Sequence, residues 1–83
     1  MINSATTVRH VTKDHVVIIP ATGYSVTVFN VSEGVVEAVV AAADGSETIR
    51  LLVEPPGPGR TMSVRRDDFG VIDILYSERD DQA

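Results

Sequence analysis

Residues 35–54 read VVEAVVAAADGSETIRLLVE, two apolar runs on either side of Asp44-Gly45. An Asp-Gly pair between apolar runs is a strong hairpin signal, and it favours a two-residue type I′ turn in which both residues have positive φ. Placing Ala43 opposite Ser46 fixes the register of the two arms. The pairs on one face are then all apolar: Val40 with Ile49, Ala38 with Leu51, and Val36 with Val53. The other face mixes apolar and charged residues, as a sheet with one buried side does.

The first arm of this hairpin also fits a helix. One helical stripe would contain Val35, Val36, Val39, Val40 and Ala43. Ser32 could cap the start of such a helix and Gly45 its end. The sequence therefore leaves open an α+β fold with a helix at residues 33–44.

Valine, isoleucine and threonine dominate the other apolar segments, and these β-branched side chains suit strands. The pattern predicts strands at Thr6 to Thr12, His15 to Ile19, Tyr24 to Val31, Val35 to Ala43, Glu47 to Glu54, Thr61 to Arg65 and Val71 to Tyr76. We expect an all-β fold, a small antiparallel meander that closes into an SH3-like or Sm-like barrel or a sandwich. This single domain would span residues 1–76, followed by an acidic flexible tail at 77–83.

With 83 residues, the chain is long enough for one small core, and association with a second copy would help to stabilise it. The chain has no cysteine, which excludes disulfides, thiolate metal sites and cysteine nucleophiles. The two histidines, His10 and His15, have only Asp14 as a nearby carboxylate, so no metal site is expected. Stability must therefore come from packing.

The net charge of −5 comes from seven basic and twelve acidic side chains, and the acidic excess follows Arg66. Such a chain presents no broad basic face, so DNA binding is not expected. The first twelve residues contain no continuous apolar core of a signal peptide. The apolar run from Val35 to Ala43 is also far shorter than a membrane span. We expect a cytoplasmic protein with no membrane partner.

Motifs of catalysis and cofactor binding are missing from the sequence. There is no G-x-S-x-G elbow, no phosphate-binding P-loop and no dinucleotide fingerprint. Arg65-Arg66 and Asp67-Asp68 are adjacent in sequence, but neighbouring residues of a strand point to opposite faces and do not converge. The sequence therefore predicts no catalytic residues, no cofactor and no enzymatic activity.

One stretch of about a third of the chain suggests a family. Residues 48–56 read TIRLLVEPP, and residues 62–69 read MSVRRDDF. This part resembles the carbon storage regulator family of dimeric translational repressors, in which an apolar strand with an arginine leads to a proline. A short strand with a basic pair and two acidic residues follows. The resemblance implies an intertwined β dimer in which Arg66 contacts RNA. The longer loop at 57–60, the acidic C-terminal segment and the few aromatic residues depart from it.

Several predicted strands are apolar on both faces, which is more than one small core can cover. We therefore expect a non-catalytic β module that acts through protein–protein interaction or self-assembly, with an RNA-binding regulator as the alternative. The residues expected at an interaction surface are Val17, Ile19, Leu52, Leu75, Arg65 and Arg66. The two arginines would serve the RNA-binding alternative.

Overall fold

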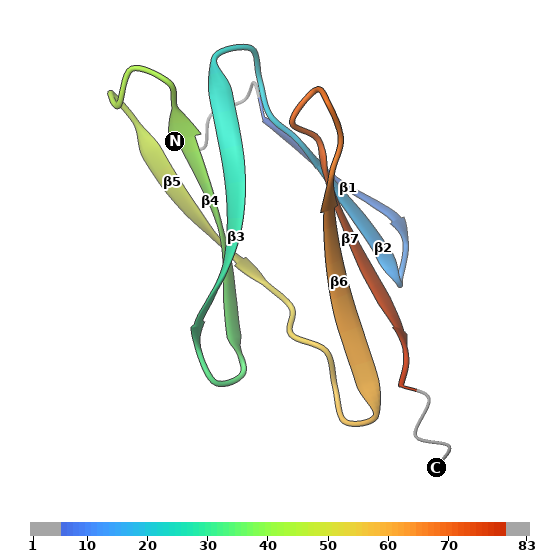
Figure 1. The fold of residues 1–83 in the computed structure, drawn as a ribbon. Coiled ribbons are helices and arrows are strands. Elements are labelled where there is room, and N and C mark those ends of the chain that lie inside the picture. The colour runs from blue at the N-terminus through green and yellow to red at the C-terminus, as the bar shows by residue number, and fades with distance from the viewer. Residues whose placement is uncertain (1–5, 80–83) are drawn as a thin grey trace.

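The computed structural model describes residues 6–79, which form seven strands and no helix (Figure 1). The strands are β1 (Thr7–Thr12), β2 (His15–Ile19), β3 (Tyr24–Ser32), β4 (Val35–Ala42), β5 (Thr48–Val53), β6 (Arg60–Arg66) and β7 (Ile72–Glu78). The all-β prediction is confirmed, and each predicted strand is present with ends that differ by at most two residues. Residues 6–79 contain no helix that is long and apolar enough to cross a membrane.

The strands form two antiparallel sheets that face each other (Figure 1). One sheet has the order β1-β2-β7-β6, and the other has the order β3-β4-β5. The second sheet is a meander, whereas in the first the last strand returns to pair between β2 and β6. Within residues 6–79, no strand of one sheet pairs with a strand of the other. The fold is therefore a sandwich of two layers, and the predicted closure into a barrel is not observed.

The core lies between the central strands of the two layers. Its buried side chains are Ile18, Val26, Val36, Ala38, Val40, Ile72 and Ile74. They come from β2 and β7 on one side and from β3 and β4 on the other, and in β4 and β7 they occupy alternate positions. Alternate residues of a strand share a face, so these strands turn one apolar face inward. Full burial of each larger side chain contributes about 1.5–3 kcal/mol.

The register predicted for the β4–β5 hairpin is confirmed, but its turn differs from the prediction. Val40 pairs with Ile49, Ala38 with Leu51 and Val36 with Val53, as predicted. Only Gly45 of the turn has a positive φ, of 77°, so the type I′ prediction is wrong. The amide of Gly45 donates to Ala42, and the Asp44 carboxylate accepts from the amide of Ser46. These local hydrogen bonds keep Asp44 at an ordinary negative φ.

The helix considered at residues 33–44 is wrong, because that segment consists of the turn before β4, β4 itself and the start of the turn after it. β4 is the central strand of its sheet and pairs on both sides. A central strand has apolar residues on both faces, and over a short run this pattern also matches a helical stripe. Tertiary pairing decides between the two.

The last strand extends beyond the domain boundary expected at residue 76. Ser77 and Glu78 belong to β7, where they pair with Thr61 and Arg60. The predicted tail therefore contributes its first two residues to the sheet. Residues 80–83 lie outside the described part of the chain.

Candidate interaction surface

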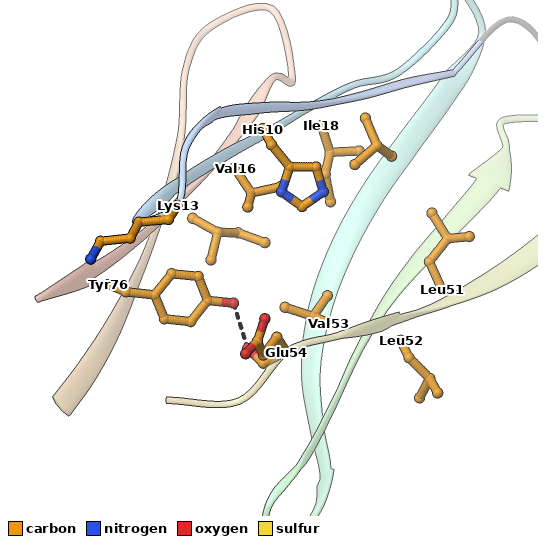
Figure 2. A pocket seen from close by; sticks show the side chains of 11 residues that line it. His10, Lys13, Val16, Ile18, Leu51, Leu52, Val53, Glu54 and Tyr76 are labelled. Carbon is orange, nitrogen blue, oxygen red and sulfur yellow. Dashed lines mark hydrogen bonds between the residues drawn. The ribbon is translucent and has the colours of Figure 1, made fainter. Parts of the chain in front are cut away.

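A cleft opens between the two layers where β1 of one sheet faces β5 of the other (Figure 2). It has a volume of about 120 Å³. The lining residues are mostly apolar: Val8, Val16, Ile18, Leu51, Leu52, Val53 and Ile74, with His10, Lys13, Glu54 and Tyr76. Figure 2 shows that the hydroxyl of Tyr76 and Glu54 meet at one end, and that the side chain of Lys13 starts nearby and extends away from them. The cleft is therefore an apolar slot with a polar end.

Hydrogen bonds hold the polar end of the cleft together. The hydroxyl of Tyr76 donates to the backbone carbonyl of Glu54 (Figure 2). Arg60 Nη2 donates to Asp14 Oδ1 at 2.7 Å, and its guanidinium lies 5.9 Å from the centre of the Tyr76 ring. Burial, and then the nearby Glu54 carboxylate, raise the pKa of the Tyr76 phenol, which Arg60 partly opposes. The hydrogen bond to Asp14 raises the pKa of Arg60 further above its ordinary value.

The outer side of β5 is an open backbone edge. The amide of Ala42 donates to the carbonyl of Glu47, so this pair is a hydrogen-bonded pair of the β4–β5 ladder. Such pairs alternate along an antiparallel ladder. The backbone groups of Thr48, Arg50 and Leu52 therefore point away from β4, and we call these groups the β5 edge. No hydrogen bond to them is found within residues 6–79.

The other edge strands are guarded in ways that β5 is not. β1 and β3 each contain an irregularity in their ladder, at His10/Thr12 and at Asn30/Ser32. β6 carries three arginines, and one of them, Arg66, bonds to the carbonyl of Val26 in β3 and so closes that side of the sandwich. β5 pairs with β4 without any irregularity and has one charged residue. Irregular pairing and charge are the usual protections of a sheet edge, so β5 is the most open one.

The outer face of the second sheet carries two exposed apolar side chains among charged ones. Phe29, Glu37 and Leu52 form one cross-strand row on the outer face of the second sheet. Leu52 is 80% exposed and Phe29 50% exposed. Between them, Glu37 accepts a hydrogen bond from Arg50 at 3.2 Å. A leucine this exposed on an edge strand points to a contact surface.

Three of the predicted interaction residues lie elsewhere. Val17, Ile19 and Leu75 share the outer face of the first sheet, on the neighbouring strands β2 and β7. All three are half-buried. Val17 lies in a row with Arg9 on one side and Asp73 on the other. The structure thus brings these three residues together but separates them from Leu52, which is in the other layer.

The two predicted arginines lie on opposite faces of β6. Arg65 is opposite Asp73 on the outer face, whereas Arg66 is opposite Ile72 and reaches across to the carbonyl of Val26. They do not form one basic patch. The RNA-binding alternative stays a prediction.

The two histidines lie apart. His15 Nε2 lies 2.8 Å from Asp73 Oδ1 on the open outer face of the first sheet. His10 lies in the cleft, beside Val16 and Ile18 (Figure 2). Residues 6–79 hold no group of three potential metal-ligating side chains.

Sequence reasoning missed the cleft and its polar end, including Glu54 and Tyr76. The alternation of Leu51 and Val53 with Leu52 is visible in the sequence, and it indicates that Leu52 faces away from the core. The sequence of β5 does not reveal that it is an edge strand, because this depends on which other strands pair with it.

No family model, curated protein or solved structure matches this chain. The surface must therefore be interpreted from its own chemistry.

Proposed function

We propose that this protein is a non-catalytic β-sandwich module that binds another protein chain through the β5 edge. The observation that carries the proposal is an unguarded backbone edge beside an exposed leucine and an apolar cleft. An extended segment that adds to a sheet edge gains main-chain hydrogen bonds, and pockets for its alternate side chains supply specificity. The β5 edge has both elements.

The cleft suits alternate side chains of an added strand. Residues Leu51 and Val53 of β5 turn their side chains into it, opposite Val8 of β1. A strand next to β5 would direct every second side chain to the same side. Apolar residues at those positions would enter the cleft, and burying them contributes about 25 cal/mol per Å².

The test uses peptides selected from a random library displayed on phage, with the whole protein as bait. We expect selected peptides to alternate apolar and polar residues, and to shift the NMR amide signals of Thr48, Arg50 and Leu52 when they are titrated.

The variant Leu52→Pro removes the edge amide, and proline is tolerated where the N–H of an edge strand faces solvent. It should weaken binding by about two- to tenfold, the loss of one net hydrogen bond. The control is Thr27→Lys on the outer face of β3, which should bind as the wild type does. Selected peptides that shift only residues outside β5 and the cleft would overturn the proposal.

A further inference from the structure

We infer that the strand added to the β5 edge is β5 of a second copy of this chain, in a two-fold dimer with Leu52 opposite the partner's Leu52. This inference rests on the proposed function and names the partner. A two-fold interface brings the same surface patch of both copies together, so the patch must complement itself. The sequence and register of β5 meet that condition.

Charge selects one register among the possible ones. With Leu52 on the two-fold axis, Arg50 lies opposite the partner's Glu54, and this ion pair occurs twice. If Arg50 were on the axis, two arginines would face each other, and like charges directly opposite are destabilising. Placing Leu51 on the axis would leave Arg50 opposite the partner's Leu52, with no charge partner.

The backbone agrees with this register. Arg50 and Leu52 direct their N–H and C=O groups to the open edge, and Glu54 is two residues further along the same chain direction. These positions would form the hydrogen-bonded pairs of the new ladder. Pro55 and Pro56 follow immediately and lack the amide needed to extend it. The ladder would therefore span residues 50–54 of both copies and end at the prolines.

The side chains of the new ladder also match on both faces. On the inner face, Leu51 meets the partner's Val53 and extends the apolar lining of the cleft across the axis. On the outer face, the row of Phe29, Glu37 and Leu52 continues into the same row of the partner. The dimer accounts for the exposure of Leu52, because this side chain becomes covered only when both copies are present.

The first measurement is the mass of the full chain by size exclusion with light scattering, at about 100 µM, a concentration suited to a small edge interface. We expect twice the 8.9 kDa of one chain. Leu52→Lys places two lysines on the axis and should give a monomer. Thr27→Lys adds the same charge to the same face away from the β5 edge and should stay dimeric.

A charge exchange tests the register. Arg50→Glu and Glu54→Arg should each give a monomer, because each places like charges opposite one another. An equimolar mixture of the two variants should form a one-to-one heterodimer. In that heterodimer the glutamate introduced at position 50 faces the arginine introduced at position 54, and at the other end the native Glu54 faces the native Arg50. The double variant should dimerise by itself. Thermal unfolding of each single variant checks that the monomer is folded.

Each failure has its own meaning. A folded wild-type monomer at about 100 µM that still binds selected peptides at β5 would overturn the dimer and leave the proposed function standing. A dimer that is indifferent to Leu52→Lys would place the interface elsewhere and overturn the inference. Single variants that stay monomeric when mixed would contradict the register with Leu52 on the axis.

Discussion

The hydroxyl of Tyr76 shows how one polar atom can connect the two layers of a small sandwich. Tyr76 belongs to β7 in the first sheet, and its hydrogen bond reaches the backbone just after β5 in the second. The ring itself packs against the core. The residue therefore combines apolar burial with a polar contact at its tip, as tyrosines at the boundary of a core often do.

Replacing Tyr76 by phenylalanine tests this contact. We expect Tyr76→Phe to lower the free energy of unfolding by about 1 kcal/mol near neutral pH, the net value of one hydrogen bond. Burial raises the pKa of the phenol in the folded state, so folding favours the neutral form. The stability that the neutral phenol of Tyr76 contributes is complete at pH values below its pKa in the unfolded chain. It is lost as the pH rises through its higher pKa in the folded protein.

The measurement is urea unfolding of the wild type and of Tyr76→Phe at about pH 8 and about pH 11, on either side of the ordinary tyrosine pKa. The difference between the two proteins should shrink at the higher pH. An equal difference at both values would show that the hydroxyl does not carry the effect.

At the scale of one element, the turn between β6 and β7 is held by a single side chain. The Asp67 carboxylate Oδ1 accepts from the amides of Phe69 at 2.8 Å and of Val71 at 2.9 Å. Gly70, with a φ of 82°, completes the turn by donating to the carbonyl of Asp67. Phe69 stands 88% exposed at this turn. An aspartate that bonds to amides shortly after it is a common way to stabilise a turn.

The neighbouring carboxylates of this turn make a matched pair. Asp67→Ala should lower the free energy of unfolding by about 1 kcal/mol, because two amides lose their partner to water. Asp68→Ala removes the same charge but no hydrogen bond found in residues 6–79, and should change it by less than about 0.5 kcal/mol. Urea unfolding measures the free energy of unfolding of both variants. If both lose the same amount, the effect comes from the lost charge and not from the hydrogen bonds of the turn.

At the scale of the whole molecule, the distance between the layers depends on a small side chain at the centre. Ala38 of β4 is completely buried and belongs to the core cluster with Ile18, Val40 and Ile74. Side chains from the two inner faces of a sandwich interdigitate, so small residues must alternate with large ones. A larger side chain at position 38 would push the sheets apart.

Ala38→Leu should therefore lower the free energy of unfolding by about 1–3 kcal/mol, the usual cost of overpacking. Ala41→Leu makes the same change on the outer face of the same strand and should cost less than about 0.5 kcal/mol. Thermal or urea unfolding distinguishes them. A tolerated Ala38→Leu would mean that the layers have room to separate.

The sequence left the segment of β4 open to a helix, but it determined the other strand segments and the register in which β4 meets β5. Both depend on neighbours along the chain: β-branched residues, alternation with period two, and a turn centred on Asp44-Gly45. It also placed Leu52 on the face away from Leu51 and Val53. Even locally the predicted turn type was wrong, because the hydrogen bond from Ser46 to Asp44 stabilises a different turn.

Only the tertiary structure decided that β7 inserts between β2 and β6, that β5 is an edge, and that the sandwich opens between β1 and β5. It also decided that Arg66 turns inward to Val26 while Arg65 faces outward. Pairing of strands that are distant in the chain depends on which apolar faces pack together. Strands with apolar residues on both faces, such as β2 and β4, allow several such arrangements. The packing of the whole fold selects one of these arrangements, and in that arrangement β5 is an edge strand.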